Sequence, residues 1–130
     1  MTYEDKELLL KDLCTRLPYG VKVESVFINT DAKKRKPRGI EVFDATCILM
    51  IRDGFGEFKP YLFPLSSMTD KQKNEYQYIT ERWMNDPAYS ISDSIDWLNE
   101  NHFDYRGLIE KGLAIDATGT DIYAVPEESL

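Results

Sequence analysis

A single histidine and its neighbouring aspartates are the residues of this sequence best suited to acid–base or metal chemistry. Within 21 residues lie Asp96, His102, Asp104 and Asp116. A His–Asp pair supports general acid–base catalysis or binds a metal ion. The chain has no second histidine, however, and no HExxH or similar ligand spacing. A nucleophilic triad needs Ser66 or Cys14 to meet His102 through folding. We therefore expect His102 to be structural and expect no catalytic residue, cofactor or metal ion; a small hydrolase built on His102 and nearby carboxylates is an alternative.

A run of cations is the second feature with a chemical meaning. Five positive charges fall within six residues, at Lys33, Lys34, Arg35, Lys36 and Arg38. Clustered cations attract phosphates and acidic partners, because binding releases counterions. Stacking aromatic residues do not interrupt this run, and the rest of the chain is acidic. A solvated loop that discourages edge pairing is the first interpretation, and weak nucleic-acid or nucleotide binding through the basic loop 33–38 is the alternative.

Charge is unevenly distributed along the chain. Residues 1–85 hold 14 basic and 13 acidic side chains, whereas residues 86–130 hold two basic and ten acidic ones. The net charge of −7 argues against a protein whose whole surface binds phosphate backbones. The acidic half indicates a solvated surface or an affinity for a basic partner.

Composition places the chain among ordinary globular proteins. It has 130 residues, of which 42% are hydrophobic and 30% charged, enough for one domain with its own core. The polar N-terminus differs from a signal peptide, and no apolar run reaches the length of a membrane span. Cys14 and Cys47 lack a CxxC spacing, so we interpret them as reduced, mostly buried thiols. We expect a cytoplasmic protein with no membrane partner.

The elements that must position these residues form an α+β pattern. Thr2 and Asp5 resemble a capping box before an N-terminal helix that ends near Pro18 and Gly20. Residues 21–65 are β-rich, with strands expected at 21–28, 40–51 and 57–65. We expect a small antiparallel sheet that can curl into a partly closed barrel.

The C-terminal half is expected to be helical within the same single domain, 1–130. Thr69 and Gln72 form a capping box before a helix that ends at Asp86, and a second helix is expected to run from Ser90 or Ser92 to about 101. We expect the helical part, 66–117, to end with a short helix from Asp104 to Gly112 and a strand at 113–117. We expect residues 118–130 to form a weakly ordered tail. The aromatic residues of the middle third are expected to fill the core rather than line a ligand groove; they are Tyr61, Phe63, Tyr76, Tyr78, Trp83 and Tyr89.

Three stretches resemble a family of small proteins from bacteriophages and prophages of gut anaerobes. They are LLLKDLCTRLPYGVK (8–22), KPYLFPLSSMT (59–69) and NHFDYRGLIEKGLA (101–114). The family's middle motif more often carries Arg where this chain has Phe63, and the basic loop lies in a variable segment. The resemblance brings no activity, substrate or cofactor with it. It implies a phage-type accessory protein of the bacterial host cytoplasm, and we expect a non-enzymatic binding protein that acts on a host or phage protein.

Overall fold

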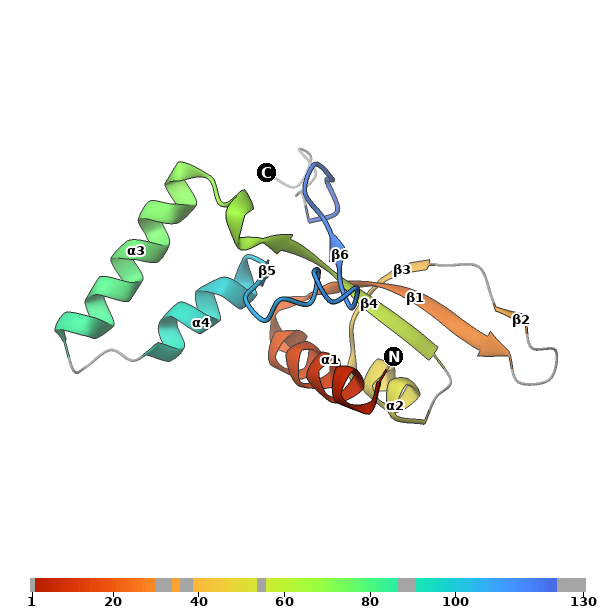
Figure 1. Ribbon diagram of the computed structural model, residues 1–130. Coiled ribbons are helices and arrows are strands. Elements are labelled where there is room, and N and C mark those ends of the chain that lie inside the picture. The colour runs from red at the N-terminus through yellow and green to blue at the C-terminus, as the bar shows by residue number, and fades with distance from the viewer. Residues whose placement is uncertain (1, 30–33, 36–38, 54–55, 87–90, 124–130) are drawn as a thin grey trace.

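The computed structural model describes residues 2–29, 34–35, 39–53, 56–86 and 91–123. These residues form an α+β fold with an N-terminal helix, in which helices α1 and α2 cover one face of a sheet and α3 and α4 project from one end (Figure 1). Among the described residues, no helix is long and apolar enough to span a membrane.

Helix α1 (Tyr3–Arg16) begins at the predicted capping box. The Thr2 hydroxyl accepts the Asp5 N–H at 3.0 Å, and the Asp5 carboxylate accepts the Thr2 N–H at 3.5 Å. A 3₁₀ turn (Leu17–Tyr19) follows and ends at Gly20, whose φ of +68° suits a residue without a Cβ. The predicted helix and both of its ends are confirmed.

Strand β1 (Lys22–Asn29) is the centre of the sheet. The short β2 (Lys34–Arg35), β3 (Gly39–Val42) and β4 (Gly56–Pro64) all pair with it in antiparallel register. The two-residue strands β5 (Phe103–Asp104) and β6 (Ile115–Asp116) pair with β4 in parallel. The strands within 21–65 pair antiparallel, as expected, whereas β5 and β6 make the whole sheet mixed, and the sheet is open rather than barrel-like. Long connections return the chain to the edge of β4 in the parallel direction, and local sequence patterns do not encode such pairings.

The strand expected at 40–51 is wrong beyond Val42. Helix α2 (Ala45–Asp53) replaces its second half. The Asp44 carboxylate caps this helix by accepting the Cys47 N–H at 3.1 Å. Cys47 and Ile51, one helical turn apart, are then buried together. A short run of apolar residues is compatible with a buried strand and with a buried helix. Here the capping hydrogen bond of Asp44 favours the helix.

The main core lies between the sheet and helices α1 and α2. Leu9 and Leu13 of α1 pack there against Val23 and Phe58 of the sheet, and the exposed fraction of each is 1% or less. Burial of a side chain of this kind contributes about 1.5–3 kcal/mol. The buried face of α1 thus includes Leu9 and Leu13, whereas Cys14 is exposed rather than buried as expected.

Helices α3 (Asp70–Asn85) and α4 (Ile91–Glu100) form a projecting hairpin, which we call the arm (Figure 1). Both helices were expected, and the Thr69–Gln72 capping box of α3 is present. A 3₁₀ turn (Leu65–Ser67) connects β4 to this arm.

The helix expected between Asp104 and Gly112 is only one turn. Leu113 N–H donates to Leu108 O at 2.9 Å and Gly112 N–H donates to Ile109 O at 3.1 Å, with Gly112 at a φ of +73°. This is the Schellman pattern that normally ends a helix. The Asp104 carboxylate holds the other end of the turn, and β6 then occupies part of the expected strand 113–117. Residues 124–130 of the expected tail lie outside the described residues.

Candidate functional site

The basic loop lies largely outside the described residues. Lys33, Lys36 and Arg38 are not described, whereas Lys34 and Arg35 form β2 and pair with Asn29 and Ile28 of β1. The placement of this short strand supports a hairpin between β1 and β3. Phosphate binding by the loop stays a prediction.

The three aspartates near His102 in the sequence serve the backbone or face solvent. The Asp104 carboxylate accepts the N–H groups of Leu108 and Ile109, each at 3.0 Å. The Asp116 carboxylate accepts hydrogen bonds from the Thr118 hydroxyl and from the Thr118 N–H, the latter at 2.8 Å, and both lower the pKa of Asp116. Asp96 lies on the exposed side of α4. Within the described ranges, no group of three His, Cys, Asp or Glu side chains is arranged to hold a metal ion.

His102 packs beneath the segment that follows β6. Its backbone has a φ of +60°, and its ring stacks on the Tyr123 ring with centroids 3.7 Å apart. Burial, together with the positive charges of Arg16 and Lys22, lowers the pKa of His102 to about 4. The imidazole is therefore neutral at pH 7. Its Nδ1 is buried and has no hydrogen-bond partner in the described part of the chain.

Tyr123 fixes this segment across the sheet. Its hydroxyl oxygen accepts the Lys22 N–H at 2.8 Å and lies 2.7 Å from the Tyr61 carbonyl oxygen, to which it donates. Burial raises the pKa of Tyr123 to about 12. The Lys22 ammonium donates to the Ile122 carbonyl at 2.6 Å. His102, which lies between α4 and β5, and Tyr123 thus connect the arm to the sheet. We call this pair the clasp.

A buried ion pair on α1 is the feature that sequence reasoning missed. Asp12 and Arg16 are both fully buried, and the Arg16 Nε donates to the Asp12 carboxylate at 2.7 Å. Arg106 donates to the other carboxylate oxygen at 3.1 Å. Arg16 also donates to the Phe103 carbonyl at 2.6 Å, which joins α1 to the base of the arm. The i, i+4 spacing of Asp12 and Arg16 beside Leu9 and Leu13 was the available signal.

Helix α3 of the arm is the least buried helix of the described fold. Described side chains of α3 are all exposed or half-buried. The half-buried Tyr76 and Ile79 pack against Trp97 of α4, and the Tyr76 and Trp97 ring centroids are 5.5 Å apart. This small cluster, which also includes Leu98 and Phe103, is separate from the main core. The arm therefore carries its own apolar contacts and leaves much of α3 exposed to solvent.

Large apolar side chains remain exposed on the arm. Tyr78 is 61% exposed and Met84 66% on α3, and Ile91 is 60% exposed at the start of α4. The Arg82 guanidinium lies 5.4 Å from the centre of the Tyr78 ring, within cation–π range. A shallow hollow adjoins this pair and is lined by Tyr78, Glu81, Arg82, Asn85 and Asp86. We call Tyr78, Arg82, Met84 and Ile91 the arm surface.

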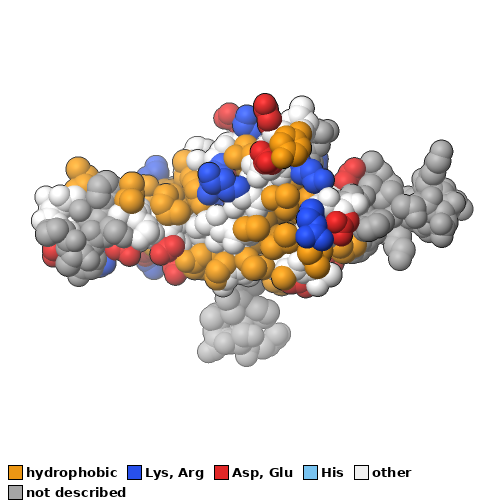
Figure 2. Space-filling view, turned by 90° about the horizontal axis from the view of Figure 1, so that it is seen from below, with side chains coloured by type: hydrophobic (Ala, Val, Ile, Leu, Met, Phe, Trp, Pro, Cys, Tyr) orange, Lys and Arg blue, Asp and Glu red, His pale blue; other side chains and the backbone are white. Residues whose placement is uncertain are grey.

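Charge also distinguishes the arm. Residues 70–100 contain seven acidic and three basic side chains. Figure 2 looks at the molecule from below, where hydrophobic side chains gather over the middle of the body and charged side chains of both signs occur towards the arm. The arm thus combines exposed apolar side chains with a net negative charge.

Comparison with known proteins does not add to this geometry. The chain matches no model of a known protein family, no curated protein and no solved structure. Its resemblance to small phage proteins stays a prediction.

Proposed function

We propose that this chain is a non-enzymatic binding protein that engages another protein through its arm. The observation that supports this proposal is the exposure of Tyr78, Met84 and Ile91 on helices that project from the body. Tyr, Arg and Met are enriched at protein interfaces relative to other surfaces. A helical hairpin that keeps such residues in water suits docking against a partner.

The net negative charge of the arm indicates the kind of partner surface that it can bind. Seven acidic residues against three basic ones favour a partner with a basic surface, since complementary charge speeds encounter and selects among competitors. The resemblance to phage-borne proteins adds a cellular setting in which this binding takes place. In that setting, the partner is a host or phage protein in the cytoplasm of a bacterial host.

The experiment is affinity capture from infected host lysate with paired variants. In the arm variant, Tyr78→Asp and Met84→Asp place charges on the arm surface. In the control variant, Tyr3→Asp and Leu49→Asp alter two exposed apolar residues of α1 and α2, which are 74% and 48% exposed. We expect one stoichiometric protein to be captured by the wild type and the control, and to be lost with the arm variant.

Two checks make this outcome decisive. Circular dichroism must show equal helix content in the variants, and nuclease treatment must leave the captured protein in place. Capture that persists with the arm variant would place the interface elsewhere. Capture of nucleic acid without a protein would favour the basic loop instead.

A further inference from the structure

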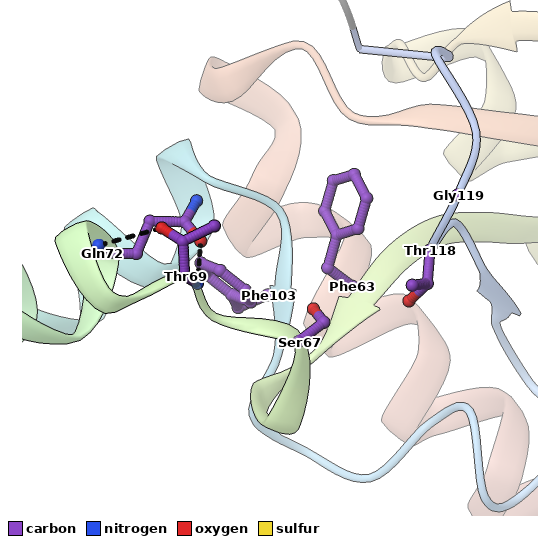
Figure 3. Close-up of a pocket in the computed structure, with 7 residues that line it drawn as sticks. All are labelled: Phe63, Ser67, Thr69, Gln72, Phe103, Thr118 and Gly119. Atoms are coloured by element: carbon purple, nitrogen blue, oxygen red, sulfur yellow. Dashed lines mark hydrogen bonds between the residues drawn. The ribbon is translucent and has the colours of Figure 1, made fainter.

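A pocket of about 270 Å³ opens where the arm joins the body (Figure 3). Segments far apart in the sequence contribute to it: the end of β4, the connection to α3, the start of α3, β5, and the turn after β6. The lining residues are Phe63, Ser67, Thr69, Gln72, Phe103, Thr118 and Gly119. The pocket is distinct from the arm surface, because it lies at the opposite end of α3 from Met84.

Two phenylalanine rings form the apolar wall of this pocket. Phe63 is half-buried and Phe103 is 1% exposed, with ring centroids 6.3 Å apart and planes tilted by 59°. Trp97 stacks on Phe103 at 5.7 Å, and Tyr123 lies 5.9 Å from Phe63. Each ring of the wall is therefore supported by another aromatic ring, so the wall is preorganised for a flat ligand.

The remaining lining side chains are polar and uncharged. Thr69 and Gln72 already cap α3, through the Thr69 hydroxyl oxygen and the Gln72 side-chain oxygen. The side-chain amide nitrogen of Gln72 can still donate to a ligand, and the Thr118 hydroxyl, which donates to the Asp116 carboxylate, can still accept. A phosphate or carboxylate here would meet no lining cation, and burial of an unpaired charge is costly. The site thus suits a neutral ligand with hydrogen-bonding groups along its edge.

We propose that this pocket binds a small, flat, uncharged nitrogen heteroaromatic compound of the nucleobase type. An apolar cavity of about 150 Å³ holds one benzene molecule, so the present pocket is large enough for a fused two-ring system. The ring lies against the half-buried Phe63, which Phe103 supports from behind, and an acceptor at the edge of the ligand meets the Gln72 amide. This site is independent of the proposed protein interface.

Adenine is the test probe, and nitrogen-15 NMR of the full chain is the measurement. We expect saturable shifts at the amides of Thr69, Gln72, Thr118 and Gly119, with a dissociation constant on the order of 0.1–1 mM. Adenosine monophosphate presents the same base with a charged group and should bind at least tenfold more weakly. Cyclohexanol, which is not flat, should give no saturable shift.

Two variants test the geometry. Thr118→Phe fills the pocket from an exposed position and should abolish adenine binding, whereas Thr46→Phe at an exposed position on α2 should leave it within twofold. Gln72→Glu keeps a capping oxygen but removes the amide donor, and should weaken binding at least fivefold. Equal affinity for the monophosphate, saturable binding of cyclohexanol, absence of adenine binding, or retained binding by folded Thr118→Phe would each overturn the proposal.

Discussion

The clasp between His102 and Tyr123 predicts an unusual response to acid. His102 is the single histidine of the chain, is 9% exposed, and has its pKa lowered to about 4 by burial and by two nearby cations. In the unfolded chain its pKa returns to the ordinary value of about 6.5. Between these two values the unfolded state binds a proton that the folded state does not. Stability is therefore expected to fall as pH decreases from 6.5 towards 4, and not to depend on His102 above pH 6.5.

The size of this effect follows from the shift. The shift from 6.5 to about 4 corresponds to at most about 3.4 kcal/mol. The ring keeps some contact with solvent, and screening reduces the contribution to about 1–2 kcal/mol. That amount is a sizeable part of the stability of a domain of this length.

Two measurements check this reasoning. Proton NMR titration follows the His102 ring directly, and urea unfolding between pH 4 and pH 7 compares the wild type with His102→Asn, a residue that tolerates positive φ. We expect a midpoint near pH 4 in the folded protein and a weaker pH dependence in the variant. A midpoint between 6 and 7, or equal slopes for the two proteins, would refute the buried clasp.

Three other perturbations have defined outcomes. Asp12→Ala leaves Arg16 buried without its carboxylate partner and should cost about 3–5 kcal/mol in urea unfolding; a loss no larger than that of the exposed Glu110→Ala control would show that the pair contributes little. Gly112→Ala should cost about 1 kcal/mol, because Gly112 has a φ of +73°, and an unchanged melting temperature would contradict the left-handed cap. Changing residues 34–36 to alanine should remove a weak, salt-sensitive oligonucleotide affinity on the order of 10⁻⁴–10⁻⁵ M in fluorescence anisotropy; tight binding that the change abolishes would instead make nucleic acid the partner.

Local signals predicted the helices better than the sheet. The capping residues Thr2 and Thr69 indicate where α1 and α3 begin, because a capping hydrogen bond joins residues only three positions apart. The same kind of signal at Asp44 lies inside the run 40–51, which was interpreted as one strand, so α2 was missed. The parallel pairing of β5 with β4 joins Phe103 to Phe63, and a contact between such distant residues leaves no periodic pattern in either segment.

The candidate sites were less predictable still. Phe63 was expected to fill the core, and the structure uses it both in an aromatic cluster and in a pocket wall. That pocket needs side chains from separate segments, which only the tertiary fold brings together. The exposure of Tyr78 and Met84 was equally hard to predict from the sequence. Whether an apolar helix residue faces a core or water depends on what packs against the helix.

The register of β5 gives the arm the topology of an insertion. Phe63 is the partner of Phe103, so the chain leaves the sheet and re-enters it at the same rung of the ladder. Helix α4 also contacts α1, but the length of the segment between these residues does not enter the pairing of β1 with β4. A hairpin inserted in this way can be lengthened or trimmed at its far end, where α3 meets α4, while the sheet keeps its register.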